Sequence, residues 1–167
     1  MNSARFHAPL RSLVGLAVAS LVIAAIIMLA PHPAAPQQAW QPPASYAVVS
    51  TVALDDGRTL RLWTGSSGWY VESLASGRHE AAVGATSGGA EHTVSETLGG
   101  LVGYLPTRDA RTVVVGAPAG VRADVHAQMF LVPATAVDAV DDTVLLTSLD
   151  ATGRTLARTT VEITGRE

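Results

Sequence analysis

The most distinct feature of the hydrophobic pattern is an apolar run from Leu13 to Ala30 that contains no charged residue. As a helix this run would be about 27 Å long, close to the roughly 30 Å hydrocarbon core of a bilayer. Arg5 and Arg11 precede it, and the next charged residue is Asp55. Because basic residues favour the cytoplasmic side, the pattern predicts one transmembrane helix with its N-terminus in the cytoplasm.

A cleaved signal peptide is the alternative interpretation of the same run, since it also has a basic start and an apolar centre. The flanks favour an anchor, because Met28 occupies a position where a cleavage site needs a small residue, and Pro31 or Pro36 would follow the cut at the likeliest alanines. Gly15 and Ala19 form a small-xxx-small pair suited to helix pairing, but such pairs also arise by chance in an alanine-rich span. The oligomeric state stays open.

Residues 31–44 form a proline-rich linker, with five of the nine prolines and no apolar period. Proline favours extended polyproline II, so the segment predicts a semi-rigid spacer. Trp40 is its one aromatic residue, either a stray side chain or one that docks on the membrane interface or the domain. The predicted organisation is a cytoplasmic tail at 1–11, a transmembrane helix at 12–30, the linker at 31–44 and an extracytoplasmic β domain at 45–167.

Beyond Ser45, apolar and polar residues alternate in short segments separated by glycine-centred turns, the pattern of half-buried antiparallel strands. In the second of these segments Leu60 and Leu62 share a face. A meander of four strands is predicted, with turns at Asp55-Asp56-Gly57-Arg58, Gly65-Ser66-Ser67-Gly68 and Ser76-Gly77-Arg78. The fold class is mainly β, an antiparallel β-sandwich first and a small β-barrel second.

The second half is expected to continue this pattern with three uncertain places. Thr86–Gly100 predicts a loop rather than a helical turn, because it is rich in glycine and polar residues. Ala123–Val132 alternates throughout and predicts one strand, and Pro133 is placed to begin a short helix reaching Val140. Further strands are expected at Leu101–Leu105, Thr112–Val115, Val144–Leu149 and Leu156–Thr164.

Composition and charge exclude several functions. Cysteine is absent, which removes disulfides, thiolate metal sites and a cysteine nucleophile, and the chain has no lysine for catalysis or for a phosphate-binding loop. Beyond the apolar run, nine arginines stand against fourteen acidic residues, a net charge of −5. Nucleic-acid binding is disfavoured because phosphate-tracking surfaces carry excess positive charge. No cofactor is expected.

Trp63, Trp69 and Tyr70 are the candidate binding residues, because two hairpin strands bring these aromatics together and such side chains anchor many interfaces. In a domain with few aromatics, packing in the core is the competing role. Exposure of the rings would separate the two roles.

Asp124 and His126 are weak polar candidates, since residues two apart on a strand point the same way and form a carboxylate–histidine pair or an ordinary surface ion pair. No metal site is predicted: the other histidines are far apart in sequence, and Asp138, Asp141 and Asp142 lack the spacing of a calcium loop.

The arginine-bearing N-terminus, the Leu13–Ala30 span, the proline-rich spacer and the strands that end in Asp150-x-x-Gly153-Arg154-Thr155-Leu156 resemble small membrane-anchored proteins of unknown function from high-GC actinobacteria. The resemblance is architectural, rests on no diagnostic motif and implies a location in the bacterial envelope. No catalytic residue is carried over.

Two classes of function follow. The first is an envelope module, anchored in the bilayer, that binds an envelope protein or a cell-wall partner. The second is a small envelope hydrolase assembled from dispersed residues such as His79, His92, His126 and Asp124. Absent catalytic motifs favour the non-enzymatic module. An enzyme would need these polar groups to converge in one pocket, whereas a binding module would expose an aromatic or apolar patch.

Overall fold

A computed structural model describes residues 40–86, 89–116 and 119–165. The chain divides into two units, Met1–Gln38 and Ala39–Glu167, and every described residue belongs to the second. The expected transmembrane segment lies outside the described residues. Among the residues that are described, no helix is long and apolar enough to cross a membrane.

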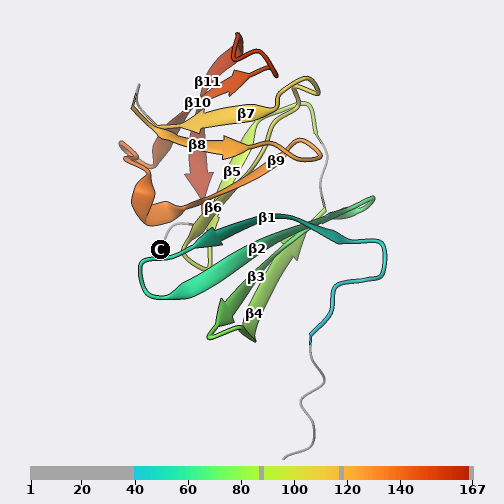
Figure 1. Ribbon diagram of the computed structural model, residues 1–167. Helices are drawn as coiled ribbons and strands as arrows, with labels where there is room; N and C mark the ends of the chain where they lie inside the picture. The colour runs from blue at the N-terminus through green and yellow to red at the C-terminus, as the bar shows by residue number, and fades with distance from the viewer. Residues whose placement is uncertain (1–39, 87–88, 117–118, 166–167) are drawn as a thin grey trace, which may run out of the picture. The chain divides into compact units, whose positions relative to one another are not determined.

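The described domain is mainly β, as the alternating pattern predicts. Its first four strands form one antiparallel sheet in sequence order, which confirms the predicted meander and its three turns (Figure 1). Leu60 and Leu62 are fully buried on one face of this sheet. The strands are β1 (Ala47–Ala53), β2 (Arg58–Gly65), β3 (Gly68–Ala75) and β4 (Arg78–Ala85).

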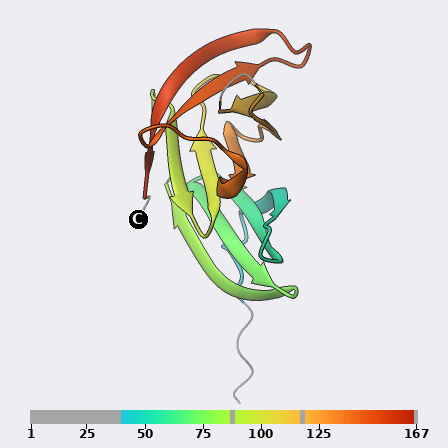
Figure 2. The same ribbon diagram turned by 90° about the vertical axis from the view of Figure 1, so that its left-hand side faces the viewer.

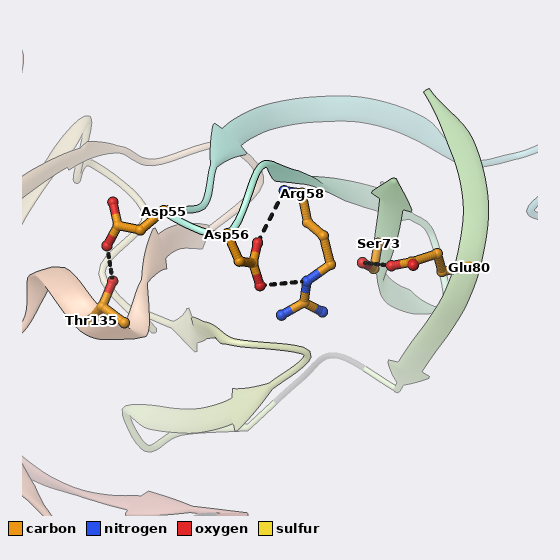
Figure 3. A network of polar contacts seen from close by, with 6 residues as sticks. All are labelled: Asp55, Asp56, Arg58, Ser73, Glu80 and Thr135. Atoms are coloured by element: carbon orange, nitrogen blue, oxygen red, sulfur yellow. Dashed lines mark hydrogen bonds and ion pairs between the residues drawn. The ribbon is translucent and has the colours of Figure 1, made fainter. Parts of the chain in front are cut away.

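Local polar contacts fix the turn between β1 and β2 (Figure 3). The backbone N–H of Arg58 donates to Asp56 Oδ1 over 3.0 Å, and Arg58 Nε donates to Asp56 Oδ2 over 2.7 Å. Because its carboxylate accepts these bonds, the pKa of Asp56 is lowered, with the backbone bond from Arg58 as the largest cause. Asp55 of the same turn accepts a 3.0 Å hydrogen bond from Thr135 Oγ1, far away in the sequence.

The remaining seven strands form a second sheet in the order β8-β7-β10-β11-β5-β6-β9, which curls until it is nearly barrel-shaped. Figure 2 shows the long, curved β10 and β11 in orange and red. All neighbouring pairs are antiparallel except β11 and β5, which pair in parallel at Ile163 and Thr164. The strands are β5 (Thr93–Thr97), β6 (Gly100–Tyr104), β7 (Thr112–Val115), β8 (Val121–Asp124), β9 (Met129–Pro133), β10 (Thr143–Leu149) and β11 (Thr155–Thr164).

Two hydrophobic clusters meet on β6 and β9. One lies inside the curled sheet and includes Phe130 and Val132 of β9. The other joins the curled sheet to the four-stranded sheet, where Met129 and Leu131 of β9 pack with residues such as Leu62. Successive residues of β9 therefore enter different clusters, and both of its faces are buried. The two sheets are held together through this shared strand pair.

Glycine allows one close contact inside the curled sheet. Gly103 of β6 lies opposite Phe130 of β9, and a Cβ at Gly103 would stand 2.2 Å from two atoms of the Phe130 ring. The ring occupies the place that any larger residue would need, so a residue without a side chain is required here.

Three sequence-based expectations for the second half were wrong. The segment Thr86–Gly100 is not all loop, because it contains β5, whose only buried residue is Val94. Ala123–Val132 is not one strand, since Ala127 and Gln128 turn the chain between β8 and β9. The helix expected from Pro133 to Val140 is a single 3-10 turn, η1 (Ala134–Ala136), and Pro133 precedes it with extended backbone.

The sequence Gly-Arg-Thr-Leu occurs at 57–60 and again at 153–156, and each occurrence begins in the same kind of turn. In the first, Leu54 N–H donates to Arg58 O, and in the second Asp150 N–H donates to Arg154 O. Each turn has its arginine bonded to a nearby aspartate, Asp56 or Asp150. Common hairpin chemistry accounts for the likeness without an internal duplication.

Candidate binding surface

Aromatic rings gather on the face of the four-stranded sheet that points away from Leu60 and Leu62. We call this surface the aromatic face and define it by its rings. Trp40 stacks on His79 with ring centroids 5.0 Å apart and meets Trp63 and Tyr70 edge-to-face at 6.2 Å and 5.9 Å. Tyr46 meets Tyr70 edge-to-face at 4.9 Å. The members are Trp40, Tyr46, Trp63, Tyr70 and His79.

Strand register brings the central pair together. Trp63 of β2 lies directly opposite Tyr70 of β3, and the preceding pair, Leu62 and Val71, points to the other face and is fully buried. Adjacent residues of a strand point to opposite faces, so a buried Leu62–Val71 pair fixes Trp63 and Tyr70 on the outer side. Both rings are partly exposed.

Two tyrosine rings of the aromatic face lie over glycines. A Cβ at Gly84 would come within 2.3 Å of Tyr70 Cδ1 and 2.6 Å of the Trp69 carbonyl oxygen. A Cβ at Gly65 would come within 2.8 Å of Tyr46 Cδ2. The rings therefore rest against backbone, and larger residues at these glycines would displace them.

Glu72 holds the polar part of the aromatic face. Its side chain is only 5% exposed, yet it has partners on both oxygens. Trp63 Nε1 donates to Oε2 over 3.0 Å, Arg61 forms an ion pair with the same oxygen at 4.0 Å, and His79 Nδ1 lies 3.2 Å from Oε1. Buried carboxylates need such partners. The Glu72 carboxylate thereby fixes the orientation of both the Trp63 indole and the His79 imidazole.

A neighbouring contact secures the β3–β4 pair beneath this face. The register shifts after Ser73, which leaves Glu80 as the extra residue of β4. Ser73, itself buried, donates from Oγ to Glu80 Oε2 over 3.1 Å (Figure 3). This bulge brings His79 within reach of Glu72.

Trp69 does not belong with the other two predicted binding residues. It points to the opposite face of β3, packs against the cluster that contains Leu62, and lines a groove of about 700 Å³. Glu91, His92 and Glu162 line the same groove. Burial lowers the pKa of His92, because an imidazolium is harder to keep in a partly desolvated place.

The remaining polar candidates are dispersed. Asp124 ends β8 and His126 begins the following turn; both are exposed, and neither a hydrogen bond nor an ion pair joins them. Both line a groove that includes neither His79 nor His92. Within the described ranges, no group of three or more acidic, histidine or cysteine side chains is placed to hold a metal ion.

Sequence reasoning placed Trp63 and Tyr70 together and left docking of Trp40 on the domain open, but it did not place Tyr46, His79 or the buried carboxylate on the aromatic face. Glu72 carried a usable signal, since it lies two residues after Tyr70 and must share its face. His79 needed the bulge in β4, and Trp40 and Tyr46 needed tertiary contacts from outside the sheet. Comparisons of the chain with family models, curated proteins and solved structures return no match.

Proposed function

We propose that this chain is a membrane-anchored, extracytoplasmic binding module of the cell envelope, and that the aromatic face contacts its protein or cell-wall partner. The observation that carries the proposal is the gathering of four partly exposed aromatic side chains on one face. Tryptophan and tyrosine supply large contact areas and dominate many interfaces.

Preorganisation supports a binding role for these rings. Trp63 is fixed through Glu72, and Tyr70 rests against Gly84, so neither ring has to be ordered when a partner arrives. Binding to ordered side chains avoids part of the entropy cost of association. Trp40, which the sequence assigns to the linker, stacks on this face, so a partner bound there would also contact Trp40.

The proposed location rests on the sequence alone. The Leu13–Ala30 run, the preceding arginines and the proline-rich spacer support one membrane span and an exterior domain, in the manner of the actinobacterial envelope proteins that the chain resembles. We describe the domain as a sandwich in which one layer curls toward a barrel. The hydrolase alternative gains no support, because the groove that holds Asp124 and His126 includes neither His79 nor His92.

A pull-down from native membranes tests the module directly. The tagged full-length protein is compared with a Trp63→Ala/Tyr70→Ala variant, and Trp69→Phe serves as the matched control on the opposite face of the same strands. The proposal expects a partner that is retained by Trp69→Phe and lost by the double variant. Circular dichroism and thermal unfolding establish that each variant is folded at the assay temperature. A partner that the folded double variant retains would contradict the proposal.

A further inference from the structure

The turn between β8 and β9 has unfavourable backbone conformations. Ala127 and Gln128 occupy its two central positions with φ of 49° and 66°, the left-handed region that asparagine and glycine usually fill in such turns. His126 and Met129 exchange both backbone hydrogen bonds across the turn, at 2.9 Å and 2.8 Å. Gln128 Nε2 donates to Leu105 O over 3.0 Å, which helps to hold the turn in place.

Hydrogen-bond alternation shows which backbone groups of β8 face outward. Val125 N–H donates to Arg111 O, so Val125, Ala123 and Val121 direct their backbone groups toward β7. The backbone N–H and C=O groups of Arg122 and Asp124 therefore point away from β7. Those of His126 point the same way, because they bond Met129. These groups form the free edge of β8.

The same alternation applies to β9. Leu105 N–H donates to Gln128 O, so even-numbered residues of β9 direct their backbone groups toward β6. Leu131 N–H and C=O and the Pro133 carbonyl consequently point toward β8. If the β8–β9 hairpin continued beyond the His126–Met129 pair, the backbones of Asp124 and Leu131 would exchange two hydrogen bonds.

That continuation does not occur. β8 pairs only with β7 and β9 only with β6, and the curled sheet stays open between them. A groove of about 400 Å³ lies along this opening, lined by Arg122, Asp124, Leu131 and Pro133, with Val49–Val52 of β1 as a further wall. Among the described strands, β7 is the only ladder partner of β8, so the outward backbone groups of Arg122 and Asp124 belong to a free sheet edge, and both residues are exposed. A free strand edge presents backbone N–H and C=O groups with which a further strand can pair.

We propose that this seam is a second interaction site, which accepts an extended peptide segment of a partner protein as an added strand on β8. Main-chain groups of Arg122 and Asp124 face the groove from the edge of β8, and the ligand that complements them is another peptide backbone. Ala123, Val49 and Val52 present small or branched apolar side chains to the groove, so the segment carries small and β-branched residues. The site lies on a surface different from the aromatic face.

The test uses the full-length protein in detergent micelles and the probe acetyl-Thr-Val-Thr-Val-Thr-Val-amide, followed by NMR amide exchange and chemical shifts. In the free protein the amide of Asp124 is expected to exchange rapidly, because it lies on the exposed edge of β8. Saturating peptide slows exchange at Asp124 by at least about tenfold, the protection given by one added hydrogen bond. Val121 and Ala123, already bonded to β7, change little.

Two substitutions of Asp124 distinguish a role of its backbone N–H in peptide binding from a role of its side chain. Asp124→Pro removes the outward N–H without breaking the β7 ladder, because proline is tolerated on a free strand edge. It is expected to weaken peptide binding by at least about tenfold, whereas Asp124→Ala keeps affinity within about threefold. Arg122→Pro replaces Asp124→Pro if the latter fails to fold by circular dichroism.

Several results would overturn the proposal. Slow exchange of Asp124 in the free protein would mean that the seam is closed or filled by the chain itself. Protection that appears on raising the protein concentration without peptide would identify a second copy as the occupant. No protection at about millimolar peptide, or equal loss of affinity in Asp124→Ala and the proline variants, would also reject a strand-addition site.

Discussion

Gly84→Ala should disturb the aromatic face without altering any of its side chains. The added Cβ would stand 2.3 Å from Tyr70 Cδ1, 2.6 Å from Tyr70 Cε1 and 2.6 Å from the Trp69 carbonyl oxygen. Each separation is shorter by about 0.9 Å or more than the roughly 3.5–4.0 Å at which nonbonded carbon atoms attract. The ring and the β3–β4 pair must both move, and overpacking of this kind costs about 1–3 kcal/mol.

A double-mutant cycle shows how much of the cost of Gly84→Ala comes from the clash with the Tyr70 ring. Urea unfolding is measured for the wild type, Gly84→Ala, Tyr70→Ala and the double variant. Because Tyr70→Ala removes the two ring clashes and leaves the clash with Trp69 O, the cost of Gly84→Ala should fall by about 1 kcal/mol in the Tyr70→Ala background. The same cost in both backgrounds, or no cost in either, would refute the view that Tyr70 rests on Gly84.

The remaining predictions concern the turns and the membrane topology. Ala127→Gly relieves a positive φ and should raise the free energy of unfolding by about 1 kcal/mol in urea unfolding; a loss of stability would contradict it. A hydrogen bond from Thr152, together with those from Arg154 and the Thr152 backbone, lowers the pKa of Asp150 to about 2, below its unfolded value. Asp150→Asn should therefore lower stability above about pH 4, and the difference from wild type should shrink as pH falls and vanish below about pH 2; a pH-independent difference in thermal unfolding would contradict this. Val140 is 69% exposed, and the chain has no cysteine, so Val140→Cys should react with a membrane-impermeant maleimide in intact cells; labelling only after lysis would contradict an exterior domain.

Period-two alternation predicted the four-stranded meander because its signals are local. Leu60 and Leu62 are separated by one polar residue, and Asp55-Asp56-Gly57-Arg58 carries the residues that a tight turn needs. The predicted all-antiparallel arrangement failed at β5. That strand has one buried residue, Val94, and joins β11 in parallel across a long stretch of sequence. Its position depends on tertiary pairing that no local pattern records.

The turn between β8 and β9 was missed because its residues are unusual for their positions. Ala127 and Gln128 do not mark a turn, and apolar-polar alternation continues through them. The Gln128 side chain donates a hydrogen bond to the Leu105 carbonyl oxygen of a neighbouring segment, so the contact that offsets the unfavourable turn conformation comes from tertiary structure. For the aromatic face, Trp69 was wrongly grouped with Tyr70, although adjacent strand residues point to opposite faces.

Site-specific photocrosslinking tests the central claim most directly. A photoreactive phenylalanine analogue replaces Trp63 on the aromatic face or, as the control, the exposed Val140 outside it. The full-length protein is irradiated in native membranes, and folding of each variant is established by circular dichroism. The account predicts a discrete adduct from position 63 that is absent from position 140. Equal adducts from both positions, or none from position 63 in the folded protein, would contradict a binding role for the aromatic face.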